Sequence, residues 1–344
     1  MRSGSFGLFS VLSAHIMRER WRSCLQSVRP STVVNGDTVI RRRRLTPGTA
    51  HIGEKLAPMT AAALLRSFLY VPGDRADRIG KALDAGADAI LIDLEDSVAL
   101  SAKEAARHVA VESLRSRSGE GPAVWVRINT GEIGRADAAA LATEAAHLGG
   151  VVLAKCDDPD WLDEIASIIS SSIPLSPLIE SALGLRRLDA LCAHPRVSQC
   201  HLGEIDLLAE LGAHSGAGPQ LLGHAHAELL YASAAARILP PIGGVYPTFR
   251  DHEGFTADSV HLAQLGFAGR PAIHPCQVPM INAAFRPSAD ELATAAALVA
   301  SYDEALARGQ GAVTDEQGRM VDEAVVRRAR QLLAGQRHEE PTTK

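Results

Sequence analysis

The chain has 344 residues, of which 46% are hydrophobic and 4% aromatic, and its formal net charge is −5. This length accommodates one large domain of about 250 residues with appendages, or two smaller domains. The negative charge gives no reason to expect a nucleic-acid partner, and no apolar run approaches the roughly 18 residues that predict a membrane span. The five cysteines are scattered and form no CxxC pair, which argues for a reducing compartment and against a zinc site.

The N-terminal segment 1–65 differs from the rest of the chain. It is rich in arginine, including the run 41–44, and contains few acidic residues. Three interpretations stay open: a disordered basic tail, a translation start upstream of the true one, or an organelle-targeting peptide. We favour a tail or an upstream start and therefore expect a cytoplasmic protein. An organelle matrix is the alternative if the segment is a transit peptide.

From residue 67 the chain alternates short apolar runs with helical patterns. Strands are expected over 67–71, 88–94, 123–128, 150–154, 175–179, 199–202, 241–245 and 271–273, with helices between them. Eight strands with intervening helices predict an α/β fold, the TIM (β/α)₈ barrel, over 66–287. The alternative, a doubly wound open sheet, would carry a Gly-rich phosphate turn after its first strand, and the segment 72–75 lacks that pattern.

Two more helices are expected after Pro287, over 288–308 and 321–334, joined by the polar segment 309–319. We interpret 288–334 as a C-terminal helical extension that acts as a mobile lid or as an arm reaching another subunit. Residues 335–344 are expected to be a disordered tail.

Charged residues gather where the predicted strands end, which is the face on which barrel enzymes carry their chemistry. Glu180 and Asp206 each follow an apolar run, and two converging carboxylates with open positions suit Mg²⁺, with Mn²⁺ as the alternative ion. The other strand ends carry Arg75, Glu95, Asp96, Arg127, Lys155 and His274. Such a mixture predicts a metal that is held by carboxylates beside cations that bind a substrate carboxylate. His274 fits a strand-end cap better than a catalytic base.

Several motifs resemble those of the HpcH/HpaI aldolase and citrate lyase β-subunit-like family, and their layout is closest to the malyl-CoA and citramalyl-CoA lyases. The resemblance covers roughly residues 66–334. It rests on the segments 67–75, 93–98, 126–129, 178–185, 202–212, 266–277 and 284–288. One departure is Ala154, which precedes Lys155 where the family usually has proline, so the loop there is expected to differ.

The resemblance implies a Mg²⁺-dependent carbon–carbon lyase that cleaves a 3-hydroxyacyl-CoA thioester into acetyl-CoA, or a homologue, and a 2-oxo acid. Malyl-CoA, citramalyl-CoA and citryl thioesters are the implied substrate types. By this resemblance Glu180 and Asp206 bind the metal, and Arg127 stabilises the enolate oxygen. The expected substrate-binding residues are Arg75, Glu95, Asp96, Arg127 and Lys155.

The segment 318–322 resembles the lid of the free-standing acyl-CoA lyases. That lid implies a homotrimer or hexamer, in which Asp322 acts as acid/base and closes over the site of a neighbouring subunit. From the residues alone, Asp322 is equally an N-cap of the last helix. Four alternatives stay open for the activity: a thioesterase or synthase on the same scaffold, a citryl-thioester lyase β-like subunit, an idle binding subunit, and an aldolase of free 2-oxo acids.

Overall fold

The computed structural model describes residues 64–117, 121–213, 218–315 and 317–336. The predicted basic segment therefore lies outside the described residues up to position 63, and so does the expected tail from position 337. Within the described residues, no helix combines the length and apolar character needed to cross a membrane.

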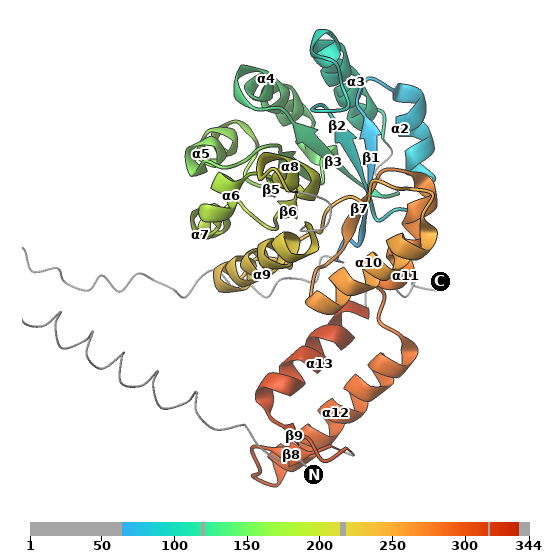
Figure 1. Cartoon of the computed structure of the whole chain (residues 1–344), viewed down its shortest axis with the longest axis vertical. Helices are drawn as coiled ribbons and strands as arrows, with labels where there is room; N and C mark the ends of the chain where they lie inside the picture. The colour runs from blue at the N-terminus through green and yellow to red at the C-terminus, as the bar shows by residue number, and fades with distance from the viewer. Residues whose placement is uncertain (1–63, 118–120, 214–217, 316, 337–344) are drawn as a thin grey trace, which may run out of the picture. The chain divides into compact units, whose positions relative to one another are not determined.

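A sheet of seven parallel strands forms the centre of the fold (Figure 1). Its spatial order is β6-β5-β4-β3-β2-β1-β7. The strands are β1 (Ser67–Pro72), β2 (Ala89–Asp93), β3 (Ala123–Ile128), β4 (Gly150–Leu153), β5 (Leu175–Ile179), β6 (His201–Leu202) and β7 (Arg270–Ala272). All residues of β2, β4 and β5 are buried, as expected of parallel strands that are covered on both faces. The prediction of an α/β fold is confirmed.

The predicted strand over 241–245 is wrong in its extent. There Ile242 alone forms isolated parallel bridges, one to His201 of β6 and one to Gly269, which precedes β7. Pro240 and Pro241 lack backbone N–H groups and cannot donate to a ladder, so only a short stretch can pair. The bridges of Ile242 nevertheless connect the two edges of the seven-stranded sheet, which is therefore curled.

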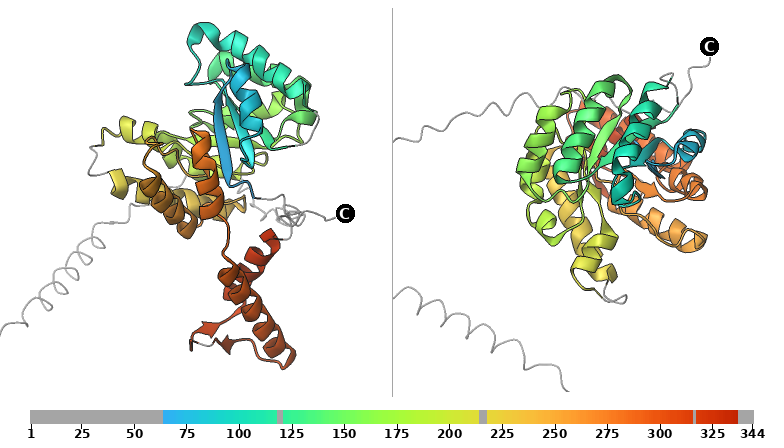
Figure 2. Two further views of the ribbon diagram at one scale, coloured as in Figure 1. Left: turned by 90° about the vertical axis from the view of Figure 1, so that its right-hand side faces the viewer. Right: turned by 90° about the horizontal axis from the view of Figure 1, so that it is seen from above.

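Helices stand around the outside of the strands (Figure 2, right). The α-helices that follow the strands are α2 (Ala76–Leu83), α3 (Lys103–Arg115), α4 (Gly131–Leu141), α5 (Pro159–Ile168), α6 (Ala182–Arg186), α7 (Leu188–Ala193), α8 (Glu204–Glu210), α9 (Gly218–Ala236), α10 (His252–Leu265) and α11 (Val278–Ala284). Short 3₁₀ turns are η1 (Leu100–Ala102), η2 (Ala142–His147) and η3 (Pro275–Gln277). One apolar core lies between helices and sheet, and a second, which includes Phe68, Trp125 and Ile242, lies inside the curled sheet.

Helices α8 and α11 were not predicted. The first of them changes the expected placement of Asp206, which lies in the first turn of α8 rather than at the end of a strand. Strand β6 ends at Leu202, and Gly203 is the residue that precedes the helix. Asp206 thus follows a strand by one tight turn and still reaches the carboxyl end of the sheet.

After α11 the chain forms two long helices, α12 (Ala289–Ala307) and α13 (Glu323–Gln336), with a two-stranded antiparallel hairpin of β8 (Val313–Thr314) and β9 (Met320–Val321) between them. The predicted bounds of both helices agree with the observed ones to within about two residues. Tyr302, Val321 and Val326 are buried in a small core of their own. The role of this extension as a lid stays a prediction.

Candidate functional site

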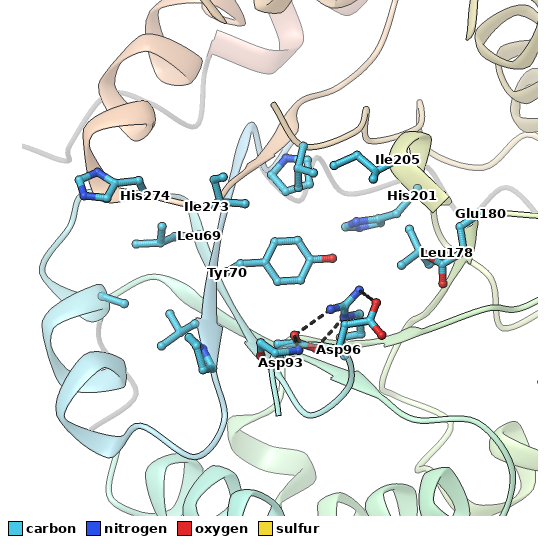
Figure 3. Close-up of a pocket in the computed structure, with 18 of the residues that line it drawn as sticks. Leu69, Tyr70, Asp93, Asp96, Leu178, Glu180, His201, Ile205, Ile273 and His274 are labelled. Atoms are coloured by element: carbon cyan, nitrogen blue, oxygen red, sulfur yellow. Dashed lines mark hydrogen bonds and ion pairs between the residues drawn. The ribbon is translucent and has the colours of Figure 1, made fainter. Parts of the chain in front are cut away.

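A cavity of about 870 Å³ opens where the strands end. Figure 3 shows 18 of its lining residues. The lining comes from β1, β2, β3, β5, β6, β7, α2 and α8 and from the loops at the strand ends. Among the residues predicted from strand ends, five line this cavity: Asp96, Arg127, Glu180, Asp206 and His274. The structure therefore places the candidate metal carboxylates and the candidate oxyanion-binding arginine around one space.

Arg127 is held by Asp93, a residue that the strand-end argument missed. The two occupy paired positions on β3 and β2, and Arg127 Nε and Nη2 donate to the two oxygens of Asp93 at 2.6 and 2.7 Å. Both side chains are buried. Although burial opposes ionisation, the guanidinium holds the pKa of Asp93 below its ordinary value. This two-pronged pair fixes the plane of the guanidinium group.

Tyr70 of β1 was also missed, and it meets Arg127 from the other side. The guanidinium carbon of Arg127 lies 5.0 Å from the centre of the Tyr70 ring, a separation at which a cation and an aromatic face attract. Burial raises the pKa of the Tyr70 phenol, so the hydroxyl keeps its proton and stays a hydrogen-bond donor. Figure 3 shows this hydroxyl turned toward the side of the cavity where His201 and Glu180 lie.

Glu180 follows β5 directly and is 5% exposed. Its Oε1 accepts the backbone N–H of Lys155 at 2.6 Å, and Lys155 adopts a left-handed backbone conformation with φ of 47°. Burial raises the pKa of Glu180 to about 7 against the lowering effects of the Lys155 N–H and of Arg127, and the nearby charge of Asp206 raises it further. The raised pKa of Glu180 means that the Lys155 N–H and the Arg127 charge do not fully offset its burial and its repulsion by Asp206.

Glu180 and Asp206 are two cavity-lining carboxylates that could hold a divalent cation. Gly203 lets Glu180 lie against the start of α8, because a Cβ at this position would collide with Glu180 and lie 2.7 Å from its Oε2. No group of three or more histidine, cysteine or acidic side chains gathers as a metal cluster among the described residues. Two carboxylates that leave other positions to water or ligand oxygens suit a hard ion such as Mg²⁺.

Glu95, Asp96 and Lys155 form a neighbouring ionic cluster. Lys155 Nζ bonds to Glu95 and lies 3.2 Å from Asp96 Oδ1, while Glu95 Oε2 lies 3.4 Å from Arg127 Nη1. The loop that carries the two acids is fixed by Lys103, whose Nζ donates to the Leu94 and Glu95 carbonyls at 2.8 and 2.5 Å. The ammonium group of Lys155 is therefore paired with two carboxylates of the protein itself.

The remaining predicted residues lie apart from the cavity lining. Arg75 is exposed and pairs with Asp77 at 3.0 Å, whereas its helix α2 contributes Arg78 and Lys81 to the cavity wall. Asp322 Oδ1 accepts the N–H groups of Ala324 and Val325 at 3.0 and 3.2 Å, so it caps the start of α13. The N-cap interpretation of Asp322 is confirmed, and its acid/base role stays a prediction.

The missed residues share one property: they point into the curled sheet from positions within apolar runs. Tyr70, Asp93 and His201 line the cavity, and strict alternation along each strand places them on the same inner face as the predicted residues. Because side chains alternate between the two faces of a strand, counting back by two from the strand-end residues would have identified these positions in the sequence.

A comparison with protein families finds that residues 66–275 match the HpcH/HpaI aldolase/citrate lyase family. The chain is 35% identical over 272 residues to the (3S)-malyl-CoA thioesterase of Cereibacter sphaeroides, covering 78% of this chain and 93% of the relative. It is 31% identical to the L-malyl-CoA/beta-methylmalyl-CoA lyase of Rhodobacter capsulatus, covering 80% and 96% of the two chains. Among solved structures, protein CitE from Mycobacterium tuberculosis in complex with magnesium, acetoacetate and coenzyme A matches with a TM-score of 0.67 and 31% identity, over 80% of this chain and 98% of that chain.

Proposed function

Because the chain belongs to the HpcH/HpaI aldolase/citrate lyase family, we propose that it is a Mg²⁺-dependent carbon–carbon lyase. Its substrate is a 3-hydroxyacyl-CoA thioester that bears a carboxylate, such as malyl-CoA or citramalyl-CoA. The observation that carries this proposal is one cavity lined by Glu180, Asp206 and Arg127. A solved relative that binds magnesium and coenzyme A supports the choice of metal and thioester.

Glu180 and Asp206 would hold the ion, which when bound orients and polarises the hydroxyl and carboxylate oxygens of the substrate. Arg127 donates to the thioester oxygen as the bond between the α-carbon and the hydroxyl-bearing carbon breaks and its electron pair enters an enolate. Asp93 keeps the guanidinium group in place for this role, so the donor needs no reorganisation during the reaction. Asp322 takes the hydroxyl proton as the 2-oxo acid forms and gives a proton back to the enolate carbon, so that acetyl-CoA or a homologue is released and the Asp322 carboxylate is restored.

The predicted (β/α)₈ barrel is the arrangement that we propose for the sheet, with Ile242 in place of a full strand between β6 and β7. Its bridges to both edges support closure. At the mouth of the cavity, Arg78 and Lys81 of α2 supply positive charge. Phosphate groups of a coenzyme A thioester are ligands that such basic side chains bind.

Hydrolysis of the thioester is the second candidate function. It is favoured by the 35% identity to the (3S)-malyl-CoA thioesterase, and the same donor, Arg127, suits the oxyanion of a tetrahedral intermediate. A citryl-thioester lyase β-like subunit is a further alternative with the same metal site.

The test is cleavage of racemic malyl-CoA and citramalyl-CoA with and without Mg²⁺. 2-Oxo acid release is followed with phenylhydrazine and free thiol with a disulfide reagent. The lyase releases a 2-oxo acid and an acyl-CoA without free thiol, whereas hydrolysis releases free CoA and no 2-oxo acid. Asp206→Ala should abolish the metal-dependent product. Asp189→Ala is the matched control, because Asp189 is also an exposed acid in the first turn of a helix. Absence of both products from either thioester would overturn the proposal.

A further inference from the structure

Helix α8 carries Asp206 in its first turn, yet little within the helix itself holds it in place. It is seven residues long, its start has no side-chain cap, and Leu207 is the only one of its residues that is buried. A helix of this length is unstable by itself in water. The position of α8, and with it that of the Asp206 carboxylate, must therefore come from contacts with neighbouring elements.

Glu204 makes such contacts at the start of α8. Its Oε1 accepts the Nε2–H of His226 at 2.8 Å and the backbone N–H of Gly244 at 3.2 Å. His226 belongs to the long helix α9, and Gly244 follows Ile242, whose bridges reach both edges of the sheet. One carboxylate oxygen thus ties the first turn of α8 to two other parts of the fold.

His226 is buried in surroundings that need no polar side chain for packing. Its ring lies edge-on to Phe267, with ring centres 5.2 Å apart, and its Nδ1 is buried without a hydrogen-bond partner among the described residues. An apolar side chain would fill this space without the cost of an unpaired nitrogen. The contribution that is particular to His226 is therefore its bond to Glu204. Glu204 and Asp206 line the cavity from the same turn of α8, so a contact that fixes the first also fixes the second.

We propose that His226 is a positioning residue for the metal site: through Glu204 it holds the first turn of α8 where Asp206 can bind a divalent cation. The inference rests on the proposed function only in taking Glu180 and Asp206 as the ligands of Mg²⁺. In this role His226 touches neither the ion nor the substrate. Groups that orient metal ligands from outside typically change the metal affinity about 10- to 100-fold when they are lost.

The experiment measures Mg²⁺ affinity by titration calorimetry, with Asp206→Ala identifying the heat that belongs to this site. His226→Leu should bind Mg²⁺ about tenfold more weakly than the unmodified protein. His226→Gln should retain most of the affinity, because a glutamine amide offers an N–H near the position of Nε2. His224→Leu is the matched control: His224 lies on the same helix, is exposed and lies 3.5 Å from Glu228 of that helix, so its loss should not change the affinity.

A double-mutant cycle with Glu204→Ala tests the route of the effect. If His226 acts through Glu204, His226→Leu should change the Mg²⁺ affinity less than about twofold once Glu204 is absent. An undiminished loss in that background would overturn the inference, and so would a His226→Gln variant that binds as weakly as His226→Leu. Thermal melting checks that each variant is folded. If His226→Leu does not fold, His226→Asn takes its place with the same expected loss, because its shorter amide does not reach Glu204.

The outcomes separate this inference from the proposed function. An unchanged Mg²⁺ affinity in His226→Leu would overturn the inference and leave the proposed function standing. Absence of Mg²⁺ binding by the unmodified protein would overturn both. Mg²⁺ binding that depends on His226, without cleavage of either thioester, would overturn only the proposed function.

Discussion

Asp93 and Arg127 face each other on neighbouring strands, and their two hydrogen bonds hold the guanidinium group of Arg127 in one orientation. Asp93→Asn keeps the shape of the side chain but removes the charge that holds the guanidinium, so Arg127 can turn toward Glu95, 3.4 Å away. We expect kcat to fall about 10- to 100-fold with little change in KM, because the lost interaction is one that strengthens in the transition state. Steady-state kinetics at saturating Mg²⁺ measure this.

Asp88→Asn is the matched control for Asp93→Asn. Asp88 also accepts two guanidinium hydrogen bonds, from Arg66 at 2.9 and 3.0 Å, but it precedes β2 at the amino ends of the strands. In the (β/α)₈ arrangement that we propose, that end contributes to stability rather than to chemistry. Equal losses of kcat in both variants would show that Asp93 acts through general stability and not through Arg127.

The second prediction for a single residue concerns Gly203. In Gly203→Ala the new methyl group would collide with Glu180, so the Glu180 carboxylate must shift from its present position. We expect the affinity for Mg²⁺ to fall at least about tenfold, since a metal site tolerates little displacement of a ligand. Titration calorimetry with Mg²⁺ checks it. Gly223→Ala is the control, because a Cβ at that helical position meets open space, and its Mg²⁺ affinity should not change.

Which residues of the site could be predicted depended on where they stand in their strands. Glu180 and Arg127 interrupt apolar runs near their ends, so their charge alone marks them. His201 and Tyr70 stand inside such runs, where a histidine or tyrosine is commonly a core residue, and only the curvature of the sheet makes their inner face the wall of a cavity. Lys155 was predicted from its charge, but its fixed contribution is a backbone N–H to Glu180, which no side-chain pattern reveals.

At the scale of elements, Arg270 ties β7 to the helix that precedes it. This fully buried arginine donates to Asp258 at 2.7 Å, to Ser259 at 3.1 Å and to the Gly244 carbonyl at 2.9 Å. Arg270→Met leaves the carbonyl unpaired, so the free energy of unfolding should fall by about 2–3 kcal/mol. Urea denaturation measures the loss, with Arg308→Met as control, because its pair with Glu304 is exposed and 3.9 Å long. A change below about 0.5 kcal/mol for Arg270→Met would contradict the prediction.

The strands were predictable from the sequence because parallel strands covered on both faces are continuous apolar runs. Six of them agree with the predicted bounds to within about one residue, and β6 begins two residues later than predicted. The segment 241–245 did not form the predicted strand. It begins with proline and contains two glycines, so its backbone could not pair along its length although its apolar residues resemble a strand. The seven-residue helix α8 was missed because two turns are too short for a helical period to be read.

At the scale of the whole molecule, Asp322 joins a structural role to a proposed chemical one. Asn caps a helix about as well as Asp but cannot act as an acid or base. We therefore expect Asp322→Asn to keep the melting temperature of the unmodified protein while kcat falls about 10²- to 10⁴-fold. Asp322→Ala should lower both. A kcat that is unaffected in Asp322→Asn would leave the residue as a cap only.

The proposed lid raises the question of which subunit supplies Asp322 to which site. Co-expression of Arg127→Ala with Asp322→Ala subunits, carrying different affinity tags, yields mixed oligomers from two inactive chains. If the lid closes over a neighbour, a site is complete when its own subunit has Arg127 and the neighbour has Asp322, and random mixing restores about one quarter of full activity. If the lid closes over its own subunit, every site lacks one residue and the mixture stays inactive. Restored activity would therefore make the C-terminal extension part of an intersubunit active site, and the oligomer a requirement for the chemistry.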